Sequence, residues 1–457
     1  MNPEATLSKR SGLVDAVNRV LPSLYRAGAL RRPQFDIALV KQELSDKTGL
    51  SDFGDAWFER PLTQLVSALQ QEAKLNNLGA YVASGQIRKV LKDRLHAAEL
   101  FRRHPEIDAR RIVSPVIVVG PMRSGTTRLH RLLAADERFA HIRSFETVNP
   151  VPEPDFMPGD TDRRSITGRL AMGAVHLANP VTAHIHPSGP YEPEEELGLL
   201  VRSFWGMKHE AQWQVPSYGR WTERHDATPA YEYMARLLKL IGWARGEDET
   251  KPWVLKTPQH MLDLSALLKV FPDARIIFTH RAPRSVVGSS CSLVWNQMII
   301  HSDHVEAEWI GKEWLRKSEL QIESMREARK QISQGQRMDV RFEEMERSWP
   351  ATMRDIYDFL DMEIDPALGA MQDYIEASKQ ELHRHPHHYS LESFGLDEAL
   401  VTERFRSYVE AFDLQAPDDN TTPDARSIHL PDLGEAMPPY VSEASQWRRR
   451  TTAGARS

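Results

Sequence analysis

The sequence has a single cysteine, Cys291, among its 457 residues, so no disulfide can form within the chain. No apolar stretch approaches the roughly 20 residues that a membrane-spanning helix needs. Residues 1–17 lack the apolar core of a secretory signal. Neither sign of charge dominates the composition. The formal net charge of −6 argues against bulk binding to nucleic acid. These absences predict a cytoplasmic protein in a reducing compartment, with no membrane span.

The composition that remains, 41% hydrophobic and 27% charged, is typical of a globular protein. Residues 1–110 repeat apolar side chains every three or four positions, most clearly over 62–73 and 87–101, which predicts an N-terminal helical region or cap. Residues 111–414 mix strand and helix patterns and predict an α/β domain. Residues 415–457 are poor in apolar side chains and predict an extended or disordered tail.

Four apolar segments have the character of buried strands, and helical patterns lie between them. They are 112–119, 253–258, 274–281 and 338–342. Continuous β-branched runs such as IVSPVIVV are typical of parallel strands that are covered on both faces. The alternation predicts an α/β fold with a P-loop-like parallel central sheet flanked by helices.

A glycine loop, GPMRSGTT at 120–127, directly follows the first of these strands. Its two glycines are spaced as in a phosphate-binding loop, where backbone N–H groups and a helix N-terminus cradle an anion. Three hydroxyl side chains add further donors: Ser124, Thr126 and Thr127. An ordinary tight turn is the alternative, but the SGTT sequence after VIVVG favours a phosphate site.

The loop lacks the lysine that grips the β and γ phosphates of a nucleoside triphosphate, because Thr126 stands at that position. No apolar strand ends in a convincing aspartate for Mg²⁺. A triphosphate with its metal therefore fits poorly. A single 5′-phosphate that bears a second anion, neutralised by Arg123 without a metal ion, fits better.

This loop resembles the 5′-phosphosulfate loop, P-[KR]-S-G-T-T, of sulfotransferases that use 3′-phosphoadenosine 5′-phosphosulfate (PAPS). A second motif of that family is an arginine after a strand with a serine eight positions later, matched here by Arg281 and Ser289. The resemblance is to the large bacterial branch and covers about 45–412. It implies PAPS as co-substrate, 3′-phosphoadenosine 5′-phosphate (PAP) as product, and no metal. It also implies these donor-binding residues: Arg123, Ser124, Gly125, Thr126, Thr127, Arg281 and Ser289.

Sulfuryl transfer requires positive charge over the leaving phosphate, because negative charge builds there. Arg123, which matches the family's basic catalytic residue, can supply it with the loop N–H groups. Lys256 and His260, in LKTPQH, are expected near the same end of the sheet. These three residues are the predicted catalytic cations and donors.

The acceptor also needs a base for its proton. Glu146, in SFETVNP, lies where several family members resemble it with a catalytic carboxylate, and is favoured over His260. Glu192 and Glu195, in EPEEE, are further alternatives. Each has a structural interpretation too, since Glu146 could pair with Arg143 and an acidic run often forms a solvated helix start.

The remaining predictions concern partners and rivals. The acceptor is expected to be a small molecule, lipid or glycan with a hydroxyl or amine. The cluster HRHPHH at 383–388 has no cysteine partner and is interrupted by proline, so a lid or acceptor-facing loop is favoured over a metal site. The rival functions are a P-loop nucleotide kinase or NTPase with a degenerate loop, and a non-catalytic nucleotide-binding protein.

Overall fold

The computed structural model describes residues 7–178, 189–382 and 390–414. The chain divides into two units, Met1–Ala416 and Pro417–Ser457, and all described residues belong to the first. The predicted tail and the histidine cluster at 383–388 lie outside the described residues.

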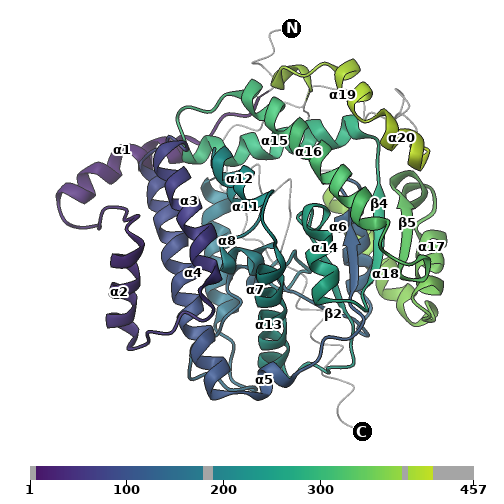
Figure 1. The fold of residues 1–457 in the computed structure, drawn as a ribbon, viewed down its shortest axis with the longest axis horizontal. Coiled ribbons are helices and arrows are strands. Elements are labelled where there is room, and N and C mark those ends of the chain that lie inside the picture. The colour runs from purple at the N-terminus through teal and green to yellow at the C-terminus, as the bar shows by residue number, and fades with distance from the viewer. Residues whose placement is uncertain (1–6, 179–188, 383–389, 415–457) are drawn as a thin grey trace. The chain divides into compact units, whose positions relative to one another are not determined.

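One parallel sheet organises the first unit, with the strand order β2–β3–β1–β4–β5 (Figure 1). The strands are β1 Val116–Val119, β2 Ala140–His141, β3 Trp253–Lys256, β4 Arg275–His280 and β5 Arg337–Arg341. Val118 of β1 pairs with Lys256 of β3 and with Ile277 of β4, so the three inner strands end close together. The four predicted strands are confirmed within a few residues, whereas β2 is too short to show any periodicity.

Helices precede the sheet and connect its strands. Before β1 lie α1 Gly12–Arg26, α2 Ile37–Thr48, η2 Ala56–Phe58, α3 Glu59–Gln71, α4 Asn77–Arg103 and α5 Glu106–Ala109. Between β1 and β3 lie α6 Thr126–Ala134, α7 Ser144–Val148, α8 Arg164–Ala178, α10 Leu197–Leu200, η3 Val201–Ser203, α11 Lys208–Gln212, α12 Pro216–Thr222 and α13 Thr228–Arg245. The rest are α14 His260–Val270, α15 Pro283–His301, α16 Ala307–Arg329, η4 Gln334–Gln336, α17 Phe342–Phe359, α18 Asp365–Leu382, η5 Glu392–Phe394, α19 Glu398–Arg404 and α20 Arg406–Phe412.

Helices cover both faces of the sheet. Successive residues of a strand point to opposite faces, so each strand contributes side chains to two different cores. Ile117 and Phe278 belong to an apolar core shared with α13, α14, α15 and α16. Val118 and Ile277 belong to a second core, shared with α6, α17 and α18. Continuous apolar strands are therefore required, and the predicted fold class is confirmed.

A third apolar core lies in the N-terminal helical region. It joins α2, α3 and α4 to residues from 201–218, which lie beyond β1 in the chain. The N-terminal helices thus pack on a segment of the α/β region, and the two share one core.

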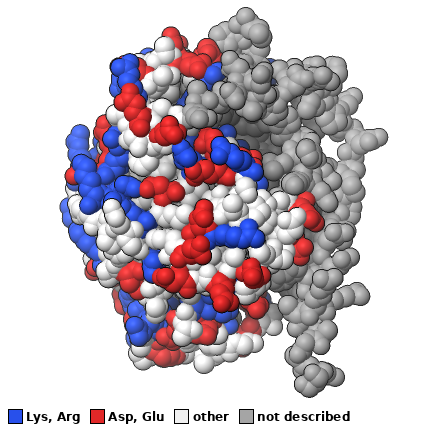
Figure 2. All heavy atoms as spheres, turned by 90° about the vertical axis from the view of Figure 1, so that its right-hand side faces the viewer, with Lys and Arg blue, Asp and Glu red and all other residues white. Residues whose placement is uncertain are grey.

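The surface of the described residues carries both signs of charge. Figure 2 shows Lys and Arg side chains interspersed with Asp and Glu over much of the described part of this face. None of the described helices combines the length and apolar character needed to cross a bilayer.

The packing of α4 on the end of α15 gives a stability test. A Cβ at Gly79 would lie 2.1 Å from the carbonyl oxygen of His301, so we expect Gly79→Ala to lower the free energy of unfolding by about 2 kcal/mol. Gly85, in the same helix, has no atom within 4 Å of its Cβ position, and Gly85→Ala should raise that free energy by about 0.5–1 kcal/mol. Urea denaturation measures both, and stabilisation by both substitutions would contradict this packing.

Candidate active site

The glycine loop joins β1 to α6 and is pressed against β4. A Cβ at Gly120 would lie 2.1 Å from Oγ1 of Thr279, so only glycine fits there. Arg123 and Gly125 both adopt left-handed backbone, with φ of 68° and 84°, and this curls the chain into the start of α6. None of the described side chains caps α6, so its first N–H groups remain available to an anion.

The loop hydroxyls have different surroundings. Ser124 Oγ donates to the carbonyl oxygen of Pro121 at 2.7 Å and lies 2.7 Å from Thr279 Oγ1, which ties the loop to β4. Thr126 is buried at the start of α6. Thr127 Oγ1 accepts a hydrogen bond from Lys256 Nζ at 3.2 Å, which links the loop to β3.

The two predicted motifs meet at the end of β4. Arg281 Nη1 donates a 2.6 Å hydrogen bond to the carbonyl oxygen of Arg123, which is 158 residues away in the chain. The Arg123 side chain itself is exposed. Ser289 lies in the second turn of α15, the helix that follows Arg281. The structure therefore brings the loop and the arginine of the second motif into contact.

Phe342 is a site residue that the sequence did not reveal. It is the first residue of α17, directly after β5, and its ring lies 3.8 Å from the guanidinium carbon of Arg281. The same ring would lie 3.1 Å from a Cβ at Gly125. Phe342 fixes the plane of the Arg281 guanidinium beside the loop.

Lys256 ends β3 and is buried, with 2% of its side chain exposed. Its Nζ forms an ion pair with Glu195, the fourth residue of EPEEE, besides its bond to Thr127. A buried ammonium group needs such a partner, because an unpaired charge away from water is strongly unfavourable. These contacts favour a role in the site over that of a surface lysine at a strand end.

Glu196 points inward from the same acidic segment. Its Oε2 accepts from the backbone N–H of Lys256 at 3.0 Å, and its Oε1 contacts Nε2 of His260 without the alignment of a hydrogen bond. Nδ1 of His260 lies 2.8 Å from the hydroxyl of Tyr231. His260 is fully buried at the start of α14. It is therefore held between two partners and is not exposed to a substrate.

Glu146 is also fully buried, in the first turn of α7. Its two carboxylate oxygens form an ion pair with Arg245 of α13, with 2.7 Å between Nε and Oε1. One of them also accepts from the backbone N–H of Arg143 at 2.8 Å. These contacts are typical of a structural carboxylate, and its role as a base stays a prediction. Glu192, by contrast, is exposed.

Asp263 is an acidic residue near this network that the sequence did not single out. Its Oδ2 accepts from Trp205 Nε1 at 2.8 Å and from Gln259 Nε2 at 2.7 Å. Burial raises the pKa of Asp263 to about 6, against the lowering effect of those two hydrogen bonds.

One cluster of carboxylates elsewhere has the spacing of metal ligands, Glu210, Glu223 and Glu313. Lys317 forms ion pairs with Glu210 and Glu223, and Arg220 forms one with Glu313. Because cations of the protein already neutralise these oxygens, the cluster is a buried ion-pair network.

The strand order, the glycine loop after β1 and the cations at the ends of β3 and β4 define a P-loop-like α/β protein. A model described as the sulfotransferase family matches residues 115–366, more than half of the chain. The chain belongs to the sulfotransferase family, which supports sulfuryl transfer as its reaction.

Two solved bacterial structures are similar to the chain. Sulfotransferase STF1 from Mycobacterium tuberculosis is 30% identical, with a TM-score of 0.71, and the match covers 82% of this chain and 100% of that one. Sulfotransferase STF9 from Mycobacterium avium is 23% identical, with a TM-score of 0.73, and the match covers 84% of this chain and 98% of that one. The STF9 structure shows a shared fold. No match to the chain is found among curated proteins.

The raised pKa of Asp263 predicts a pH-dependent effect of Asp263→Asn. The folded protein binds the proton of the Asp263 carboxyl group more tightly than the unfolded chain does. The contribution of this group to the free energy of unfolding is therefore complete below about pH 4 and is lost as pH rises through about 6. Asparagine keeps an acceptor oxygen but no charge. The difference in the free energy of unfolding, variant minus wild type, should therefore increase by on the order of 1–2 kcal/mol as the pH rises from 5 to 8.

Urea denaturation at the two pH values measures this change. Asp373→Asn, at an exposed position on α18, is the control for loss of a surface carboxylate. A stability difference that is the same at both pH values would show that Asp263 is not protonated on folding.

Proposed function

We propose that this sulfotransferase uses PAPS as its donor and transfers the sulfuryl group to a hydroxyl or amine without a metal ion. The hydrogen bond from Arg281 to the carbonyl oxygen of Arg123 carries this proposal. It joins two anion-binding motifs into one surface, and PAPS has two separate anionic ends, the 5′-phosphosulfate and the 3′-phosphate. A nucleoside triphosphate has its charge at one end only.

In this proposal the glycine loop holds the 5′-phosphosulfate. The N–H groups at the start of α6 provide the cradle, with the hydroxyls of Ser124, Thr126 and Thr127 beside it. Arg281 and Ser289 bind the 3′-phosphate. A guanidinium suits a dianionic phosphate because it donates two parallel hydrogen bonds, and Phe342 limits its rotation.

The transfer is an in-line displacement at sulfur. The acceptor oxygen or nitrogen forms a bond to sulfur while the bond between sulfur and the bridging oxygen of the 5′-phosphate breaks, and PAP leaves. Negative charge builds on that phosphate, and Arg123 and Lys256 are the cations proposed to stabilise it. The bond from Lys256 Nζ to Thr127 supports this role, since it holds the ammonium at the loop.

The proton of the acceptor needs a carboxylate, and we propose Glu195. Its side chain is 20% exposed and is paired with Lys256, so it combines contact with the site and access to an acceptor. When Lys256 turns to the leaving phosphate, the Glu195 carboxylate becomes free to accept a proton. Glu146 and His260 are fully buried and held by other residues, so in this proposal they are positioning residues.

The acceptor in this proposal is a small molecule, lipid or glycan, and the protein acts in the cytoplasm. The loops around the carboxyl edge of the sheet would form the acceptor pocket, since α/β proteins bind their ligands at that edge.

We expect Arg123→Ala and Arg281→Ala each to weaken PAP binding about 10- to 100-fold, since each removes a charged hydrogen-bond donor to a phosphate. Calorimetric titration with PAP measures the affinity. Arg128→Ala is the matched control, because Arg128 lies on α6 beside the loop but is paired with Glu346. Unchanged affinity in both variants would refute the donor assignment.

We also expect Glu195→Gln to lower kcat by about 10²- to 10⁴-fold, because it removes the base. It also removes the carboxylate that pairs with the buried Lys256 ammonium group, so kcat is compared at a temperature where the variant is shown to be folded. Glu192→Gln, at the exposed start of the same segment, is the control. Glu146→Gln should lower the thermal stability, because it breaks the pair with Arg245, and should leave kcat of the folded protein largely unchanged. A large loss of kcat in a stable Glu146→Gln protein, with activity kept in Glu195→Gln, would assign the base to Glu146.

A further inference from the structure

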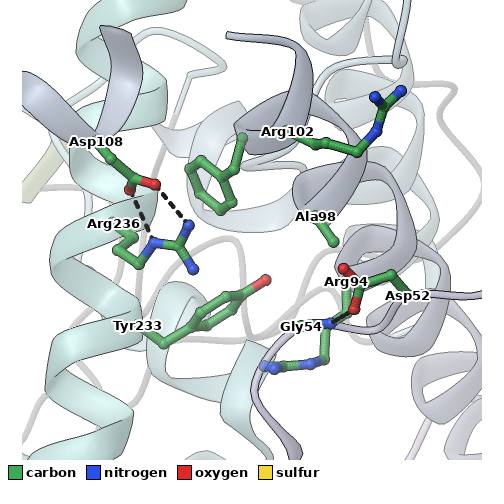
Figure 3. A pocket seen from close by; sticks show the side chains of 9 residues that line it. Asp52, Gly54, Arg94, Ala98, Arg102, Asp108, Tyr233 and Arg236 are labelled. Atoms are coloured by element: carbon green, nitrogen blue, oxygen red, sulfur yellow. Dashed lines mark hydrogen bonds and ion pairs between the residues drawn. The ribbon is translucent and has the colours of Figure 1, made fainter. Parts of the chain in front are cut away.

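A polar cavity lies between α4 and α13, and none of the residues of the proposed donor site lines it. Its volume is about 260 Å³, and its walls come from α4, α5, α13 and the loop at 52–54 (Figure 3). Of its walls, only α13 belongs to residues 115–366, the part of the chain that matches the sulfotransferase family model. The chemistry of its lining points to a ligand.

Arg94 provides a buried positive charge in the wall of this cavity, with 2% of the residue exposed. Its guanidinium donates to the backbone carbonyl oxygens of Phe53, Asp55 and Arg202, at 2.9, 2.9 and 3.0 Å. It lies 4.2 Å from the ring centre of Tyr233, and it forms no ion pair with any carboxylate of the described residues. The charges of Asp55 and Asp52 offset part of the cost of burying this cation, and an anion in the cavity would offset more of it.

Tyr233 presents an unpaired hydroxyl to the same space. The residue is only 8% exposed, and its hydroxyl bonds to none of the described residues. Figure 3 shows the hydroxyl pointing into the space between Arg236 and α4. Burial raises the pKa of Tyr233, so the group stays protonated and can donate.

Arg236 offers a second free donor next to Tyr233. Its Nε and Nη2 hold Asp108 at 2.9 and 2.8 Å, and its guanidinium stacks 4.0 Å from the ring centre of Phe101. Within the described part of the chain its Nη1 has no hydrogen-bond partner, which leaves two N–H groups. The charge of Asp108 is taken up by this pair. Asp52, which also lines the cavity, is a carboxylate without an ion-pair partner among the described residues, and it would oppose an anion. The lining still contains three arginines, Arg94, Arg102 and Arg236, against these two carboxylates.

We propose that this cavity binds a small oxyanion, a carboxylate or a phosphate, between Tyr233 Oη, Arg236 Nη1 and the charge of Arg94. Phe101 and Ala98 form an apolar wall next to these groups, and the volume exceeds that of a bare ion. The ligand is therefore a small organic acid or phosphate monoester.

The cavity is connected to the segment that carries Glu195. Arg94 holds the carbonyl oxygen of Arg202, and the Arg202 guanidinium donates to the carbonyl oxygens of Gly198 at 2.9 Å and of Val148. Gly198 lies in α10, directly after the acidic segment. A bound anion would stabilise this chain of contacts. That consequence for activity rests on the proposed function, but the binding itself does not.

Titration calorimetry of the full chain tests the binding, with inorganic phosphate and acetate as probes and sodium chloride at matched ionic strength as blank. Because the glycine loop can also take phosphate, the titrations use Arg123→Ala as background. In that background Tyr233→Phe should weaken binding about tenfold, by loss of one hydrogen bond to a charged group. Arg236→Gln should weaken it at least as much, because it removes a cation and also leaves the Asp108 carboxylate unpaired. Tyr81→Phe, at an exposed position on α4, should leave it unchanged.

Tyr233→Phe keeps the ring that lies on Arg94, so loss of binding reports on the hydroxyl alone. Binding of acetate only, or of phosphate only, assigns the ligand to carboxylates or to phosphates. No saturable binding of either probe in the Arg123→Ala protein, or equal affinity with and without Tyr233→Phe, overturns the proposal. If PAP fails to bind while phosphate still enters this cavity, the donor assignment fails and the cavity stands.

Discussion

The buried ammonium group of Lys256 is the constraint on which the site depends. The lysine ends a strand in the middle of a parallel sheet, where water cannot solvate its charge. It must therefore find a carboxylate, and Glu195 provides one. That pairing draws the acidic segment over the carboxyl edge of the sheet, next to the glycine loop. The same lysine reaches Thr127 and so ties loop, strand and acidic segment together.

Two neighbouring glutamates of the acidic segment point in different directions and have different partners. Glu195 faces the ammonium group and retains some exposure, whereas Glu196 turns inward to His260 and to the backbone of Lys256. On its other side, His260 forms a hydrogen bond with the hydroxyl of Tyr231. In the proposed mechanism this rigid inner layer would hold Glu195 in place, because small displacements of a base strongly reduce the rate.

Much of the fold was predictable, because long apolar strands and amphipathic helices carry their own periodicity. The glycine loop with Arg123 followed from a local sequence pattern, and the association of Arg281 with it followed from the resemblance to the sulfotransferase family. The surroundings of Glu146 did not, since its partner Arg245 lies 99 residues further along the chain. Phe342 and Tyr233 were missed for the same reason. Their roles depend on which side chains packing brings beside them, and no local spacing encodes that.

The proposed donor, PAPS, has two anionic ends and needs no metal ion at the glycine loop. Equilibrium binding of PAP and of Mg-ATP, each measured with and without a chelator, tests this donor assignment most directly. We expect PAP to bind with the same affinity in both conditions and Mg-ATP not to compete with it. Tight binding of Mg-ATP that the chelator abolishes, with no binding of PAP, would contradict the donor assignment.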